Sequence, residues 1–163
     1  MQSPRLNRRF VLAGFIGMLC ASIAQWNDGA VAAQDTEYKT VDGLAVYLGV
    51  VPAEIVKGHP SEHPEQTMHG GAPTGPHQYH VVAAIFDSAS GARITDAAVT
   101  AQISGLGLSG ANQKLEPMQI SGTTTYGGYF NLPGRDLYTI RLTIERPGAA
   151  RAVVVDFKYD HRR

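Results

Sequence analysis

The strictest pattern in this sequence is an alternation of apolar and polar residues between Tyr138 and Glu145. Its apolar members stand at every second position and are Tyr138, Ile140, Leu142 and Ile144. Because successive side chains of a β-strand point to opposite faces, this spacing predicts a strand with one face in a core and the other in solvent. A lone strand is not stable, so other segments must pair with it and cover its apolar face.

Six further segments have the composition of strands and are separated by turn-forming residues. They are residues 44–51, 79–87, 97–103, 114–120, 123–132 and 153–159. Only residues 52–57, which begin with a proline, are expected to form a short helical turn. About seven strands without an amphipathic helix predict an all-β fold, a single antiparallel immunoglobulin-like β-sandwich. Inside one strand, Gly127-Gly128 predicts either a bulge or a close approach of the backbone to another group.

Residues 1–33 have the layout of a signal peptide. Arginines at the start precede an apolar run over residues 10–24, and small residues at 30–33 offer a cleavage point. The adjacent pair Arg8-Arg9 resembles the twin-arginine type of signal, and the general secretory type stays open as the alternative. The apolar run is too short to cross a bilayer comfortably, so no stable membrane span is expected after the signal is removed. The sequence therefore predicts a periplasmic or secreted protein.

The remaining part of the chain is long enough for one domain. Residues 34–43 are polar and are expected to form a loosely held lead-in, and residues 44–161 are expected to form the sandwich. No cysteine follows the signal, so the domain must depend on its hydrophobic core or on bound metal. Lysine and arginine together number 14, as do aspartate and glutamate, and no basic stripe with interleaved aromatics is present. Nucleic acid is therefore not an expected partner.

Side chains that can bind a metal ion are concentrated in the connection at residues 59–80, which holds five of the six histidines of the chain. Prolines and glycines interrupt it, so the segment is predicted to be a loop. Imidazole and thioether groups bind late first-row metals, which predicts a metal site. The candidate ligands are Met68, His69, His77 and His80, with His59 and His63 as peripheral donors and Met118 as a further thioether. Copper is the expected metal, ahead of zinc and iron.

The two ends of this loop differ in how firmly they are expected to be held. His80 falls in the first residues of the strand 79–87, whereas His77 follows Pro76 and is expected to remain in the loop. An odd spacing of three would put them on opposite faces of a straight strand. The hypothesis is a half-anchored site, with His77 and His80 at the sandwich edge and Met68 and His69 closing over the metal. The alternative is a solvated or partner-binding loop whose histidines only titrate.

Several short segments carry a family resemblance. They are Tyr79–Asp87, Gly91–Val99, Tyr126–Phe130 and Tyr138–Ile140. Together they resemble the exported immunoglobulin-like domains of the YtkA and FixH type, and more broadly the CopC-type periplasmic copper carriers. The resemblance implies handling of copper or another metal outside the cytoplasmic membrane. Here the histidines lie in one loop ahead of the second strand, unlike in those families, so the resemblance assigns no individual ligand.

Motifs of the common enzyme classes are absent from the sequence. It contains no Gly-x-Ser-x-Gly elbow, no phosphate-binding glycine loop and no His-Glu-x-x-His helix, and it has no cysteine nucleophile after the signal. We therefore expect no enzymatic activity, and predict a metal-binding accessory or carrier protein. Its partners would be the metal ion and a membrane transporter or another exported protein. A secreted protein-interaction module with an incidental histidine-rich loop is the alternative.

Overall fold

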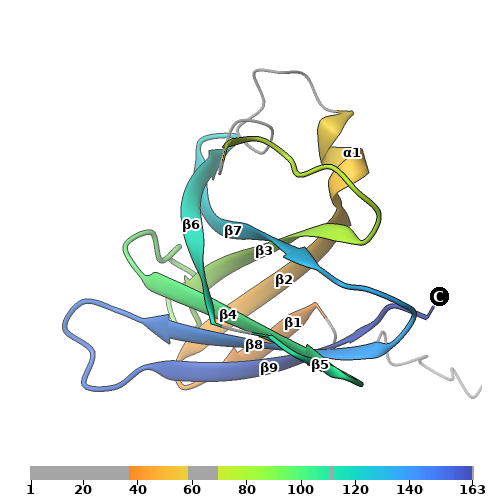
Figure 1. Cartoon of the computed structure of the whole chain (residues 1–163). Coiled ribbons are helices and arrows are strands. Elements are labelled where there is room, and N and C mark those ends of the chain that lie inside the picture. Colours follow the sequence, from red (N-terminus) through yellow and green to blue (C-terminus); the bar gives the residue numbers. More distant parts are fainter. Residues whose placement is uncertain (1–36, 59–69, 111, 163) are drawn as a thin grey trace, which may run out of the picture. The chain divides into compact units, whose positions relative to one another are not determined.

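A computed structural model describes residues 37–58, 70–110 and 112–162 of the chain (Figure 1). The elements follow in the order β1 Tyr38–Val41, β2 Leu44–Pro52, α1 Ala53–Lys57, β3 Gln78–Asp87, β4 Ala98–Gly105, β5 Leu108–Ser109, β6 Gln113–Ile120, β7 Thr123–Asn131, β8 Leu137–Glu145 and β9 Val153–Asp160. The predicted all-β fold is confirmed, since every strand pair is antiparallel and α1 is the one helix of the described residues. The described part contains no helix long and apolar enough to span a membrane.

Two strands are additional to the seven that the sequence predicts. β1 lies in the segment expected to be a loose lead-in, where its residues pair with Leu44–Tyr47 of β2. β5 is only two residues long and pairs with the end of β4, in the segment between residues 103 and 114 where no strand is predicted. Both are too short and too polar to show a clear alternation, and it is pairing with a stronger neighbour that makes each a strand.

The strands follow one another in the order β1-β2-β3-β7-β6-β4-β8-β9, with β5 attached to β4. β6 connects the two layers of the sandwich, because it changes partner along its length. Its first residues, Gln113 to Leu115, pair with β4, whereas Glu116 to Ile120 pair with β7 (Figure 1). The order β3-β7-β6 places β3 and β6 on the two sides of β7, and this arrangement builds the site described below.

Alternating residues of both layers form the core. Tyr138, Ile140, Leu142 and Ile144 of β8 are all buried, which confirms the pattern that predicted the strand. Tyr126 of β7 is completely buried, and its hydroxyl accepts a hydrogen bond from the Ala97 backbone N–H at 3.0 Å and donates one to the Ile94 carbonyl at 3.2 Å. Burial raises the pKa of the Tyr126 phenol, which therefore stays protonated as a donor.

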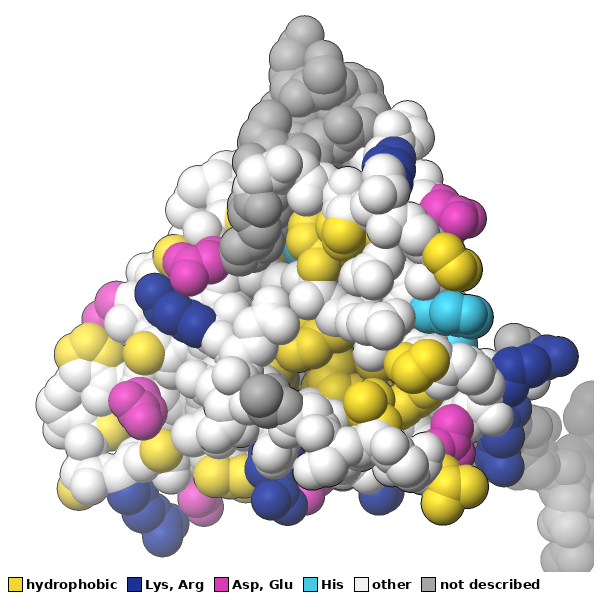
Figure 2. All heavy atoms as spheres, in the orientation of Figure 1, with side chains coloured by type: hydrophobic (Ala, Val, Ile, Leu, Met, Phe, Trp, Pro, Cys, Tyr) yellow, Lys and Arg dark blue, Asp and Glu magenta, His cyan; other side chains and the backbone are white. Residues whose placement is uncertain are grey.

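Charges of both signs are dispersed over the surface. Figure 2 shows basic and acidic side chains interspersed over the face turned to the viewer, with hydrophobic side chains gathered near its middle. On β8 and β9 the cross-strand neighbours Arg141 and Asp156 form a two-pronged ion pair, with N–O distances of 2.7 and 2.8 Å. The hydrogen bond and the charge of Arg141 hold the pKa of the Asp156 carboxyl below its usual value of 3.8.

We expect the Arg141–Asp156 pair to contribute a small stability that depends on pH. Because the pKa of Asp156 is lowered in the folded state, this contribution is complete above the unfolded pKa and is lost as the pH falls through the folded pKa. Both side chains are about half exposed, so Asp156→Asn should lower the melting temperature at pH 7 by no more than about 4 °C. Thermal unfolding of both proteins at pH 7 and pH 2 checks this, and a difference that persists at the lower pH would contradict it.

Candidate metal centre

The structure describes two of the six predicted metal ligands, His77 and His80. Met68, His69, His59 and His63 lie outside the described residues, so their role stays a prediction. His77 is exposed, has a φ of 69° and stands just before β3, where its carbonyl accepts a hydrogen bond from the Leu132 N–H at 2.8 Å. His80 is completely buried. The expectation that His77 remains in the loop while the sheet holds His80 is therefore confirmed.

His80 lies on the outer face of the sheet, by which we mean the face of strands β2, β3, β7 and β6 that is turned away from the core. Val81, Ala83 and Ile85 of β3 belong to the core, so the alternation of the strand puts His80 on the other side. There it stands opposite Val51 of β2 and Tyr129 of β7. Its imidazole stacks on the Tyr129 ring, with centroids 4.7 Å apart and planes at 27°.

Helix α1 follows directly from the end of β2 and packs on β2 and β3 (Figure 1). Pro52 begins the turn of the chain with a φ of −53°, which suits a helix start. Ala53 and Val56, on the same side of the helix, are both buried. Helix α1 therefore lies against the strand that carries His80.

Gly127 of β7 is the position over which two metal-binding side chains meet. His80 of β3 and Met118 of β6 are diagonal neighbours of Gly127, on its two sides. A Cβ atom at Gly127 would lie 2.7 Å from His80 Nε2 and 2.7 Å from Met118 Cε. The two side chains therefore occupy the space that the side chain of any residue other than glycine would fill. Because each atom lies 2.7 Å from the same point, His80 Nε2 and Met118 Cε are at most 5.4 Å apart.

This pair fits a soft metal ion. Met118 is 6% exposed and His80 is 0% exposed, so both donors lie away from solvent. The Met118 sulfur is bonded to the Cε atom that approaches Gly127, and the imidazole Nε2 faces the same point. A thioether and an imidazole are a donor set suited to copper. Thr125, directly opposite Met118, adds a buried hydroxyl that has no hydrogen-bond partner among the described residues, and such groups commonly receive a bound molecule or ion.

Acidic ligands are not gathered here. Among the described residues no group of three or more histidine, cysteine, aspartate and glutamate side chains is arranged to hold a metal ion. Glu116 stands directly opposite Gly127, but its carboxylate is 3.5 Å from the Lys114 ammonium and is 45% exposed. A site built on His80 and Met118 therefore needs a further donor to complete its coordination.

The sequence predicts this site only in part. The pattern suggests a close approach at Gly127-Gly128 but does not identify the groups that approach, and it gives Tyr129 and Thr125 no role in a metal site. Met118 was named as a further thioether without a partner. The strand order and register that bring His80, Met118 and Gly127 together could not be predicted from the sequence.

The sixth histidine, His161, lies apart from this site in an aromatic cluster. Its Nε2 is hydrogen bonded to the Tyr79 hydroxyl at 2.5 Å, and its ring contacts those of Tyr79, Tyr138 and Tyr159 at centroid distances of 4.8, 6.0 and 5.8 Å. Tyr79 adjoins His80 in sequence, but as its odd-numbered neighbour in β3 it belongs to the opposite face. His161 therefore anchors residues 160–162 to the sandwich and provides a histidine control outside the candidate site.

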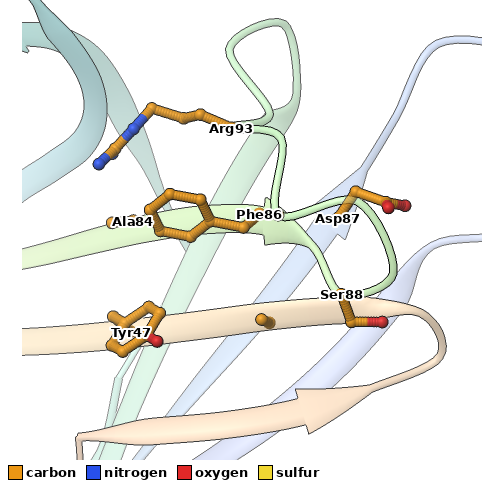
Figure 3. Close-up of a pocket in the computed structure, with 8 residues that line it drawn as sticks. Tyr47, Ala84, Phe86, Asp87, Ser88 and Arg93 are labelled. Atoms are coloured by element: carbon orange, nitrogen blue, oxygen red, sulfur yellow. The ribbon is translucent and has the colours of Figure 1, made fainter.

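An open cavity of about 460 Å³ occupies the other end of the outer face (Figure 3). The Arg93 guanidinium lies 4.4 Å from the centre of the Phe86 ring and donates a hydrogen bond to the Thr124 carbonyl at 2.8 Å. Tyr47 contacts Phe86 edge to face, with centroids 5.6 Å apart, and Tyr38 follows at 4.6 Å. These side chains form a ladder across β1, β2 and β3 that is partly open to solvent.

Comparison with known proteins supports the fold. No protein-family model matches the chain, and no curated protein matches it in sequence. A copper-bound variant of FetP from uropathogenic Escherichia coli has 15% sequence identity, with a TM-score of 0.57 over 77% of this chain and 93% of that one. FetP as isolated, from the same bacterium, has 16% identity and a TM-score of 0.56 over 76% and 91% of the two chains.

A DUF4426 family protein from Pseudomonas aeruginosa is similar in the same way. It has 16% identity and a TM-score of 0.53 over 76% of this chain and 94% of that one. At this level of identity the likeness concerns the antiparallel β-fold and not the function. The resemblance to the YtkA, FixH and CopC types stays a prediction from the sequence.

Proposed function

We propose that this protein is an exported, non-enzymatic copper-binding protein that acts as an accessory or carrier for the metal. The observation that carries the proposal is the convergence of His80 and Met118 over Gly127. Two donors of the kind that copper prefers are thereby held on a rigid sheet, away from solvent. A fold shared with a copper-bound protein is consistent with this use.

The sequence supplies candidates for the remaining ligands. Met68 and His69 belong to the connection that starts at the end of α1 and returns to β3, close to His80 in the chain. Donors from this connection would complete the coordination of an ion held by His80 and Met118. The recipient would be a membrane transporter or another exported protein, and residues 1–33 would direct the chain out of the cytoplasm.

Two adjacent glycines give a sharp test of this function. We expect Gly127→Ala to lower the copper affinity by about 10- to 100-fold, because the added methyl group would take the space between His80 and Met118. Titration of the purified wild-type protein and the variant with Cu(I), Cu(II) and Zn(II) measures the effect.

Gly128→Ala is the matched control. A Cβ at Gly128 would face the other side of β7, 3.1 Å from Leu115 Cδ2 and 3.2 Å from Gln113 Nε2. Both variants crowd their neighbours and should destabilise the fold by about 1–3 kcal/mol, Gly127→Ala more than Gly128→Ala because its contacts are shorter. Only Gly127→Ala should change metal binding. A wild-type protein that binds none of these ions, or equal affinity of the two variants, would overturn the proposal.

One observation favours the alternative of a secreted interaction module. Tyr38 and Tyr47 are both exposed and in contact with each other. Tyr47, Phe86 and Arg93 line the open cavity (Figure 3). If the ladder is the functional surface, Tyr47→Ser should abolish capture of a specific exported partner, whereas Gly127→Ala should leave it unchanged. A pull-down from exported-protein extracts that returns no specific partner would count against this function.

A further inference from the structure

We infer that the site over Gly127 takes copper as Cu(I), in preference to Cu(II) and Zn(II). The inference rests on the proposed function, because it names the form of the ion that the same site binds. It is drawn from the chemistry of the two fixed donors, from their burial and from the charges around them.

The donors are the first argument. Met118 offers a thioether, a soft and uncharged ligand that binds Cu(I) well and binds Zn(II) and Cu(II) weakly. Its Cε lies 2.7 Å from the point where a Gly127 Cβ would stand, as does Nε2 of His80, so the end of the Met118 side chain and the imidazole lie over the same residue. An ion that binds both must accept sulfur and nitrogen together, as Cu(I) does.

Burial and charge are the second argument. The cost of transferring an ion from water to an apolar site rises with the square of its charge, so it is about four times larger for a divalent than for a monovalent ion. His80 and Met118 are both buried and are uncharged as ligands. Of the described acidic residues, Glu116 stands opposite Gly127, but its charge is paired with Lys114 at 3.5 Å. Neutral buried donors therefore favour the ion of lower charge.

The surroundings of the imidazole are the third argument. The Tyr129 ring covers one side of His80 at a centroid distance of 4.7 Å, and Val51 stands opposite on β2. These neighbours limit the room for the additional water ligands that Cu(II) and Zn(II) usually keep. A crowded, largely apolar setting suits the ion that needs fewer ligands.

The inference is tested by Met118→Leu, which removes the sulfur and keeps the volume of the side chain nearly constant. Met118→Leu should lower the affinity for Cu(I) at least tenfold and leave the affinity for Cu(II) within about threefold of the wild type. The dissociation constant for Cu(I) is measured by competition with a chromophoric chelator under anaerobic conditions. The dissociation constant for Cu(II) is measured by competition with a Cu(II) chelator in air. A tenfold change in their ratio lowers the Cu(II)/Cu(I) potential of the bound ion by about 59 mV, which is measured independently.

Met68→Leu is a companion variant, because it removes the other predicted thioether and measures whether Met68 also contributes to the affinity for Cu(I). Circular dichroism of each variant confirms that the sandwich is retained. A change in the ratio for Met118→Leu supports the inference whatever Met68→Leu does. A wild-type protein that binds Cu(II) but not Cu(I), or a ratio that Met118→Leu leaves unchanged, overturns the inference while the proposed function stands. Binding of neither ion overturns both.

Discussion

Replacing His80 with alanine is expected to weaken copper binding by more than about 100-fold, the largest effect on metal affinity of any change to the described residues. The reason is that His80 contributes the one imidazole that lies on the sheet beside Met118. His80→Gln is the companion variant, because it keeps most of the volume against Tyr129 and removes the imidazole. Both variants should bind copper equally poorly, as measured by chelator competition.

Variants at His161 and His77 show how much of the copper affinity depends on His80 itself. His161→Gln is the control, since His161 is bound to Tyr79 in the aromatic cluster and should leave copper affinity unchanged. His77→Ala should cost less than His80→Ala, because His77 is exposed. The triple variant His69→Ala, His77→Ala, His80→Ala should bind no copper above background. If the triple variant kept the wild-type copper affinity, neither the histidine-rich connection nor His80 would belong to the copper site.

The second large effect concerns stability. Tyr126→Ala is expected to lower the free energy of unfolding by about 3–5 kcal/mol, because it opens a cavity in the centre of the core. Tyr126→Phe should cost about 1–3 kcal/mol, since it leaves the Ala97 N–H and the Ile94 carbonyl without their partner. Urea unfolding of the three proteins measures both differences.

The Tyr126 series also separates the core from the metal site. Tyr126 points into the core, whereas its neighbour Gly127 faces the outer side of β7. Tyr126→Phe should therefore keep the wild-type copper affinity at temperatures where it is folded. If Tyr126→Phe were as stable as the wild type, the hydroxyl would not be the link between β7 and the segment Ile94–Ala97.

The extent to which the sequence predicts this fold follows from how each element is stabilised. β8 and β9 were predicted closely, because one buried face imposes an alternation that is local to each strand. β1 was missed, since its residues are half exposed and become a strand by pairing with β2. The split of β6 between β4 and β7 was not predicted either, because pairing partners depend on tertiary structure rather than on the pattern of a single strand.

In the candidate site, too, the local features could be predicted from the sequence and the contacts between distant strands could not. The donor types could be predicted, since imidazole and thioether groups are rare enough to stand out in the sequence. That His80 belongs to a strand and His77 to the loop also followed from Pro76 and the apolar run after His80. The pairing of His80 with Met118, 38 positions later in the sequence, could not be predicted, because it depends on β7 lying between β3 and β6.

Because β6 pairs with both layers, an ion bound on one layer is expected to affect the stability of the other. Met118 is on the half of β6 that pairs with β7, and Leu115 is on the half that pairs with β4. An ion bound to Met118 that is absent from the unfolded state would stabilise the whole cooperative unit by mass action, by about 2.7 kcal/mol at 100 times its dissociation constant. Loading with copper should then slow amide hydrogen exchange in β4, on the layer that does not carry the ion.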